Sequence, residues 1–244
     1  MRRTASRWVA GVDGCKDQWV VVLRHLDTRA LVGRVVPTFG DVLAVPERPR
    51  ALAVDIPIGL PDVAVAGGRE CDRLARTLLG ARASSVFSPP SRRALKAFAN
   101  RRGYRAVSTA NAVGPNGPRL SLQSYNILPK IAEVDALMTP ALQRSVREAH
   151  PELCFAQANA GRPMKAAKKQ PSGRSERLAV LRDLGFADPF ALFGTPRPRG
   201  VAPDDILDAC ITCWTAERIA RSLAVAVPSS VPVDARGLRM EIVW

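Results

Sequence analysis

The chain has 244 residues, of which 47% are hydrophobic and 24% are charged, a composition typical of a globular protein that excludes a chain disordered throughout. Its longest apolar runs, such as "WVVVL" at 19–23, are far too short to cross a bilayer, and the basic N-terminus lacks the apolar stretch of a secretory signal, so we expect a cytoplasmic protein without a membrane partner. The five cysteines have no disulfide or zinc spacing, and we expect buried, reduced thiols.

The net charge of +14 is distributed unevenly along the chain. Between Arg73 and Ala132 there are eleven basic residues and no acidic one, and a second basic run follows at 162–177. Such asymmetry favours a polyanionic partner, of which nucleic acid is the commonest. The alternative is an arginine-rich composition whose charges are simply solvated.

The first quarter of the chain is predicted to form strands. Short Val-rich runs at 7–13, 18–26 and 29–37 are separated by turn residues, which predicts an antiparallel meander of three strands. A short helix is expected at 37–45, and the apolar run at 50–57 predicts a buried fourth strand. Because a crossover helix precedes it, this fourth strand should pair in parallel.

The remainder is predicted to be mainly helical. Between about 67 and 150 we expect helices at 70–80, 91–100, 130–138 and 140–150, with a loop at 113–118. A strand at 151–158, helices at 175–185 and 204–223, and a closing strand at 237–244 follow. This order is the layout of a ribonuclease H-like α/β fold, a mixed five-stranded sheet flanked by helices. It predicts one domain over 1–244, with a basic, mainly helical insertion at about 67–150 after strand four.

Two aspartates stand at the ends of strands that should be neighbours. Asp13 ends the first strand and Asp55 ends the fourth, so their side chains should meet at one edge of the sheet. Like charges held close raise each other's pKa unless a cation neutralises them, and the pair therefore indicates a metal site. Each aspartate also has an ordinary explanation, as a turn former or as the end of a strand.

The last long helix carries further aspartates in "DDILDA" at 204–209. Asp205 and Asp208 are three residues apart and so share one helical face. Asp204 or Asp205 can cap the helix, but capping does not explain Asp208, which lies one turn further in among apolar residues. With Asp13 and Asp55 they form an oxygen-rich set suited to Mg²⁺ or Mn²⁺. Two such ions about 4 Å apart support phosphodiester hydrolysis, which makes these four aspartates candidate catalytic residues.

Several stretches together resemble a known family. They are "GVDGC" with a following Trp, "DIPIGLP", "RECDRLARTLLGARASSVFSPP", "ILPKIAEVD", "HPELCF" and "DDILDA". They are similar to proteins grouped as domain of unknown function 429, which are regarded as predicted nucleases of ribonuclease H-like fold. The resemblance implies the same four aspartates, in an arrangement similar to that of Holliday-junction resolvases, and adds Glu152 as a metal ligand.

The resemblance also implies substrate contacts. A set of polar residues is expected to line the same cleft, namely Arg69, Asp72, Arg76, Glu133 and Asp135. Four basic residues of the second run are expected to contact a phosphate backbone, namely Lys168, Lys169, Arg174 and Arg177, and Lys130 belongs to the first basic segment with the same expected role. The chain departs from the family pattern at Asp17 and Gln18, where small glycines are frequent, and at 167–170.

Three functions remain open at this point. The first is a metal-dependent nuclease or resolvase that acts on structured DNA or RNA, for which a symmetric junction would favour a homodimer. The second is a nucleotide phosphotransferase or ATPase of actin-like ancestry. The third is a non-catalytic nucleic-acid-binding protein whose acidic cluster holds a structural metal.

Overall fold

The computed structural model describes residues 6–112 and 117–244. Residues 1–5 and most of the predicted loop at 113–118 lie outside the described residues. The chain groups into two compact units. The first, here called the sheet unit, contains the residues up to Asp55, Ser145–Val225 and Val243–Trp244, and the second, here called the helical unit, contains Ile56–Arg144 and Ala226–Ile242. The single domain with an insertion at about 67–150 stays a prediction.

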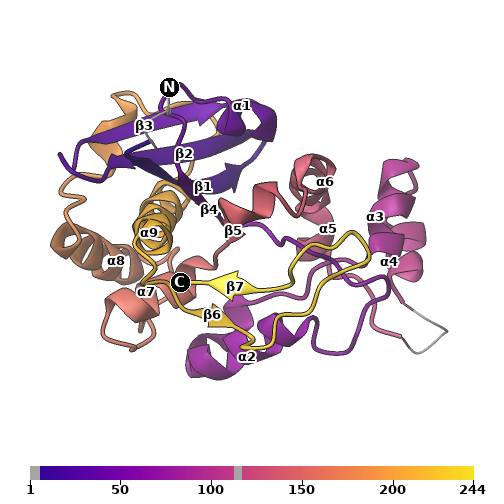
Figure 1. Cartoon of the computed structure of the whole chain (residues 1–244). Helices are drawn as coiled ribbons and strands as arrows, with labels where there is room; N and C mark the ends of the chain where they lie inside the picture. The colour runs from indigo at the N-terminus through magenta and orange to yellow at the C-terminus, as the bar shows by residue number, and fades with distance from the viewer. Residues whose placement is uncertain (1–5, 113–116) are drawn as a thin grey trace. The chain divides into compact units, whose positions relative to one another are not determined.

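A five-stranded mixed sheet forms the centre of the sheet unit (Figure 1). Three antiparallel strands come first, and two short strands pair in parallel beside the first of them. This confirms the four predicted strands and the mixed five-stranded α/β sheet. The strand order is β3-β2-β1-β4-β5, where the strands are β1 (Trp8–Cys15), β2 (Gln18–His25), β3 (Leu31–Val36), β4 (Ala51–Val54) and β5 (Val146–Glu148).

Helices cover both faces of this sheet. The long helix α9 (Pro203–Ala220) packs on β1, β2 and β4, and it packs in turn against α7 (Pro151–Ala158) and α8 (Pro171–Asp183). On the opposite face, α1 (Phe39–Leu43) sets Phe39 against the buried Trp19, with ring centroids 5.1 Å apart. A 3-10 turn, η3 (Phe190–Phe193), lies on β3.

The approach of α9 to β1 depends on Gly11. A Cβ atom at this position would lie 2.0 Å from the backbone nitrogen of Cys213 and 2.2 Å from the carbonyl oxygen of Ala209. No side chain fits there, so glycine lets the helix backbone rest directly on the strand. The residue two positions further along β1, Asp13, projects on the same face toward the helix.

Three sequence predictions differ from the structure. The helix expected at 140–150 is wrong, because these residues form a 3-10 turn, η2 (Leu142–Arg144), and the fifth strand β5. The strand expected at 151–158 is also wrong, because Pro151 occupies the first position of α7, where its missing N–H has no helical partner to lose. Only β7 (Ile242–Val243), paired with β6 (Ala226–Val227), forms from the predicted closing strand at 237–244.

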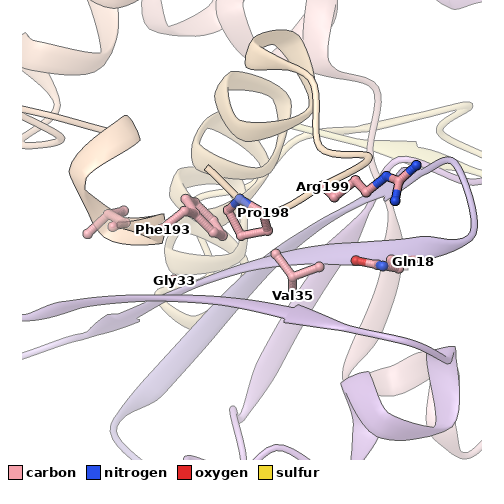
Figure 2. Close-up of a pocket in the computed structure, with 7 residues that line it drawn as sticks. Gln18, Gly33, Val35, Phe193, Pro198 and Arg199 are labelled. Atoms are coloured by element: carbon pink, nitrogen blue, oxygen red, sulfur yellow. The ribbon is translucent and has the colours of Figure 1, made fainter. Parts of the chain in front are cut away.

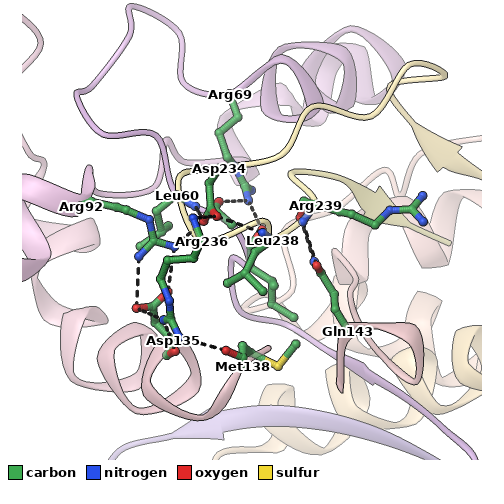
Figure 3. Close-up of polar contacts among 12 residues, drawn as sticks. Leu60, Arg69, Arg92, Asp135, Met138, Gln143, Asp234, Arg236, Leu238 and Arg239 are labelled. Atoms are coloured by element: carbon green, nitrogen blue, oxygen red, sulfur yellow. Dashed lines mark hydrogen bonds and ion pairs between the residues drawn. The ribbon is translucent and has the colours of Figure 1, made fainter. Parts of the chain in front are cut away.

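The helical unit is held to its return segment, residues 226–242, by Asp234 (Figure 3). This buried carboxylate accepts backbone N–H groups from Leu60 and Leu238, each at 3.0 Å, and forms an ion pair with Arg92. The helical unit contains α2 (Glu70–Leu79), the 3-10 turn η1 (Gly80–Ser85), α3 (Arg92–Ala99), α4 (Tyr104–Asn111), α5 (Leu122–Asn126) and α6 (Leu128–Leu137). These elements confirm the predicted helices at 70–80, 91–100 and 130–138.

Two further findings concern membrane-spanning helices and the cysteines. Across residues 6–112 and 117–244, no helix is long and apolar enough to cross a membrane. The five cysteines, all within the described residues, are buried and none of them forms a disulfide there, as expected of thiols that pack in a core.

Candidate acidic site

Asp13 and Asp55 are neighbours at one edge of the sheet. The parallel register of β1 and β4 ends at the pair Val12 and Val54, and the Asp55 N–H continues it by donating to the Val12 carbonyl at 3.0 Å. The next residues along the two strands are Asp13 and Asp55, so their backbones lie about 5 Å apart. Asp13 is only 7% exposed. The sequence prediction that the two carboxylates meet at one strand edge agrees with this register.

Helix α9 brings a third carboxylate to the same place. Asp208 lies one residue before Ala209, whose carbonyl is in the close approach to Gly11, and only 1% of Asp208 is exposed. Electrostatic interactions link Asp13 to both Asp55 and Asp208. The acidic site defined by Asp13, Asp55 and Asp208 therefore combines two strand ends with the first turns of one helix.

Lys168 supplies positive charge to this acidic site. Its Nζ lies 2.5 Å from the Asp208 Oδ2 and 3.8 Å from the Asp204 Oδ2. Asp13 and Asp55 also favour its charged form. The structure places the Lys168 ammonium group on the carboxylates, and its role as a phosphate contact stays a prediction. Sequence reasoning had no signal for the contact with Asp208, because forty residues separate Lys168 from Asp208.

The carboxylates are held in conditions that oppose their ionisation. Burial, followed by repulsion from Asp208, raises the pKa of Asp55 from its ordinary value to about 8. Burial and the neighbouring Asp55 and Asp208 raise the pKa of Asp13 well above its usual range. Burial also raises the pKa of Asp208, although Lys168 opposes this effect. For Lys168, burial lowers the pKa, but the surrounding aspartates outweigh it and the net shift is upward. The positive charge of Lys168 is therefore outnumbered by the carboxylates around it.

Asp205 combines two roles at the start of α9. Its Oδ2 accepts a hydrogen bond from the Ala202 N–H at 2.7 Å, which satisfies a free donor at the helix N-terminus. Burial raises the pKa of Asp205 to about 6, with the Ala202 N–H opposing and Asp204 adding to the rise. The structure therefore gives the predicted capping role to Asp205, while Asp204 faces Lys168.

Two glutamates surround the acidic site, and one of them was not predicted. Glu148 ends β5 opposite Val54 and raises the pKa of Asp55, after burial and the effects of Asp208 and Lys168. The helix predicted over this segment concealed its position, because a strand of three residues has no clear alternation of apolar and polar side chains. Glu152, predicted as a metal ligand, also raises the pKa of Asp208, and one of its oxygens pairs with Arg177 at 2.5 Å.

The predicted phosphate contacts of the sheet unit differ in exposure. Lys169 and Arg174 are exposed. Arg177 is 1% exposed and donates to the carbonyls of Ala166 and Gly173 as well as to Glu152. Lys169 and Arg174 are therefore accessible to a phosphate backbone, whereas Arg177 fixes the loop that carries Lys168.

The other predicted polar residues belong to the helical unit. Arg69 is buried in an ion pair with Asp72 at 2.7 Å, and Arg76 donates to the carbonyls of Gly67 and Val86. Lys130 pairs with Glu133 at 3.9 Å, and Asp135 pairs with Arg92 and Arg236. These contacts stabilise the helical unit internally, and the predicted roles of these residues in substrate binding stay predictions.

The donor set of the acidic site fits a hard divalent cation. Among the described residues, no group of three or more His, Cys, Asp and Glu side chains forms a ready-made metal site. Burial and the neighbouring carboxylates oppose the ionisation of both Asp13 and Asp55. Buried carboxylates require a cation or hydrogen-bond donors, and oxygen ligands of this kind suit Mg²⁺ or Mn²⁺. The residues present would therefore fit such an ion once Lys168 leaves Asp208.

Comparison with known proteins identifies the chain at the level of its family. Neither the curated proteins nor the solved structures gave a match. A family model described as a protein of unknown function, DUF429, matches residues 11–232. This range includes Asp13, Asp55, Lys168 and Asp208, and it covers most of both units. The chain belongs to the DUF429 family.

Proposed function

We propose that this protein is a metal-dependent nuclease that hydrolyses phosphodiester bonds at the acidic site. The observation that carries the proposal is the arrangement of three carboxylates. Asp13 and Asp55 lie at neighbouring strand ends, and α9 brings Asp208, which pairs with Lys168, close to them. The strand order β3-β2-β1-β4-β5 and the helical chain between β4 and β5 support a ribonuclease H-like fold with an insertion after strand four.

Asp13, Asp55 and Asp208 would hold Mg²⁺ or Mn²⁺, with Glu152 and Asp205 as further oxygen donors beside them. When bound, such ions lower the pKa of water and stabilise the charge that develops on a leaving oxygen. The raised pKa values of Asp13 and Asp55 mean that the carboxylates bind protons readily when no cation is present. Metal binding would therefore release protons from this site.

Lys168 keeps the acidic site folded before a metal binds. Its ammonium group neutralises Asp208 and lies near Asp204. A lysine side chain is flexible and its ammonium group is a compact point charge, so Lys168 can exchange Asp208 for a phosphate oxygen of the substrate. This exchange reconciles its position in the structure with its predicted role as a phosphate contact.

Exposed basic residues on both units support a nucleic acid as the substrate. Lys169 and Arg174 are exposed on the sheet unit, and Arg101, Arg102 and Arg105 are exposed on the helical unit. Phosphate contacts by lysine and arginine supply most non-specific affinity for nucleic acid and make it depend on salt. The net charge of +14 adds long-range attraction.

A cleavage assay with matched variants tests this proposal. Purified protein is incubated with labelled branched, single-stranded and duplex DNA and RNA, with Mn²⁺, with Mg²⁺ or with a chelator. We expect metal-dependent cleavage of at least one substrate and a loss of at least a hundredfold in Asp13→Asn and Asp208→Asn, in the range that removing one essential catalytic group gives. Asp183→Asn is the control, since Asp183 is an exposed aspartate of the same unit. Cleavage by Asp208→Asn at the wild-type rate contradicts the proposal, and ATP hydrolysis without nucleic-acid cleavage would replace it with a phosphotransferase or ATPase.

A further inference from the structure

A pocket lies on the sheet unit beside the acidic site (Figure 2). It has a volume of about 440 Å³, within the range of sites that bind small ligands. Its floor consists of Gln18, Gly33 and Val35 from β2 and β3, and its wall consists of Leu192, Phe193, Pro198 and Arg199.

The floor of the pocket and the acidic site share one face of the sheet. Val35 pairs with Val20, and Val20 pairs with Asp13, so these side chains point to the same side. The parallel register continues this row to Asp55. With strands spaced about 4.8 Å apart, Val35 lies two strands, or roughly 10 Å, from Asp13.

Close packing on this face confirms the arrangement. A Cβ atom at Gly11 would meet α9, and one at Gly33 would meet Leu192 at 2.6 Å from its carbonyl oxygen. Gly11 and Gly33 both pair with Val22. The helix that carries Asp208 and the turn that carries Phe193 therefore lie side by side on one face, with the pocket next to the turn.

The pocket has an apolar end and a basic end. Phe193, Pro198 and Val35 lie together, whereas the Arg199 side chain extends over the end marked by Gln18 (Figure 2). Arg199 is exposed, and Lys16 lies close to Gly200, the residue that follows Arg199. The segment containing Pro198 and Arg199 leads directly into α9, which begins at Pro203 with Asp204 and Asp205. The basic end thus lies toward the acidic site.

We propose that this pocket holds a nucleobase of the nucleic-acid strand that the acidic site cleaves. The Phe193 ring beside Val35 and Pro198 suits base stacking, which is sequence-tolerant because every base has a π-face. Arg199 and Lys16 suit the flanking phosphates. The separation of roughly two strands from Asp13 places this base near the scissile bond. The inference rests on the proposed nuclease function for the identity of the ligand.

The test measures binding separately from cleavage. Binding of short fluorescein-labelled oligothymidylate and oligouridylate to the full chain is followed by fluorescence anisotropy in chelator, at fixed salt. We expect Phe193→Ala to weaken binding by about tenfold, as the loss of one stacked base does, Phe193→Tyr to bind like wild type, and Arg199→Ala to weaken binding and reduce its salt dependence.

Two control variants separate a binding role from a structural one. Phe190→Ala alters the same 3-10 turn at a residue that does not line the pocket, and Arg50→Ala removes an exposed arginine at the other end of β4 from Asp55. Both should bind like wild type.

Each outcome has one meaning. Three results would overturn the inference: equal weakening of binding by Phe190→Ala and Phe193→Ala, unchanged binding in Phe193→Ala, or no binding of either oligonucleotide by wild type. In the last case, binding of a peptide or protein would assign the pocket to another class of partner. If Asp208→Asn still cuts while Phe193→Ala binds weakly, the pocket is supported and the proposed catalytic site fails.

Discussion

At the scale of single residues, Lys168 and Asp208 define the state of the acidic site. A buried carboxylate that loses its partner is strongly destabilising, because the remaining charge has neither water nor a counter-ion. The Lys168 side chain is 37% exposed and the Asp208 side chain is 2% exposed, so solvent screens the lysine and weakens the ion pair. The charged form of Asp208 therefore depends on Lys168 for its stability more than the charged form of Lys168 depends on Asp208.

This asymmetry predicts the effect of replacing Lys168. Lys168→Met should destabilise the metal-free protein by about 1–2 kcal/mol, after allowance for screening of the exposed lysine. It should also bind Mn²⁺ more tightly, since the ion no longer competes with an ammonium group for Asp208. Thermal denaturation with and without Mn²⁺ measures both effects, and Lys169→Met, at an exposed neighbour, is the control. An equal response of the two variants to Mn²⁺ would show that Lys168 does not compete with the ion.

The positions of the three aspartates of the acidic site in the fold could be predicted from sequence because each follows a local signal. Asp13 and Asp55 end apolar runs, and Asp208 lies at helical spacing inside an apolar stretch. Lys168 and Glu148 could not be assigned in the same way. Lys168 lies in a loop and reaches Asp208 only through tertiary structure, and Glu148 belongs to a strand of only three residues. Long-range pairing and very short strands leave little periodicity to read.

At the scale of elements, the contact of α9 with β1 positions the acidic site. Gly11 permits this contact because any Cβ would overlap the helix backbone at Cys213. The same contact explains why α9 is buried along most of its length. The position of Asp208 relative to Asp13 follows from it.

Gly11→Ala should therefore disrupt the site from a distance of two residues. A clash with backbone atoms cannot be relieved by a rotamer change, and overpacking of this kind costs about 3 kcal/mol or more. Denaturant unfolding should show this loss, and Mn²⁺ binding should fall with it. Gly103→Ala is the matched control, since a Cβ there meets nothing within 4 Å, and a surface change of that kind stays within about 0.5 kcal/mol. Wild-type stability in Gly11→Ala would show that α9 does not rest on β1 as described.

Strands and helices differed in how well sequence predicted them. The first four strands have clear Val-rich runs, and the long helix has an apolar face with aspartates at its start. Both predictions for the segment 140–158 were wrong. A helix followed by a strand was predicted, whereas the chain forms the strand β5 followed by the helix α7. Val146–Glu148 is a strand because its neighbour β4 supplies the backbone partners, and tertiary pairing of this kind overrides local propensity.

At the scale of the whole molecule, the chain builds two compact units from interrupted segments. The helical unit is completed by the return segment 226–242, which Asp234 fastens through Arg92 and the N–H groups of Leu60 and Leu238 (Figure 3). The helices of this unit have clear sequence signals, but the return segment has none, because one aspartate near a turn has no distinctive pattern. Asp234 therefore links the return segment to the rest of the helical unit.

The pKa of Asp234 predicts how the stability of the helical unit responds to acid. Burial raises the pKa, but the hydrogen bonds from Arg92 and three backbone N–H groups outweigh it, so the pKa is lower in the folded chain than in the unfolded one. Its stabilising effect is therefore complete above the ordinary aspartate pKa of about 4 and is lost as pH falls through the lower folded value.

Asp234→Asn should be less stable than wild type by about 3–5 kcal/mol at neutral pH, as expected when one partner of a buried ion pair is removed. This difference should shrink as pH falls from about 4 toward the lower folded pKa of Asp234, at which wild-type Asp234 becomes protonated too. Urea unfolding at several pH values measures the difference, with the exposed Asp62→Asn as control. A difference that does not change with pH would mean that Asp234 stabilises the unit through its shape and not through its charge.

The most direct test of the account is the position of Mn²⁺ in crystals of this protein, located by anomalous scattering after a soak at a concentration that supports cleavage. The account predicts an ion bound by oxygens of Asp13 and Asp208, with the Lys168 ammonium group displaced from its contact at 2.5 Å. The contradicting result is an acidic site without Mn²⁺ in which Lys168 still pairs with Asp208.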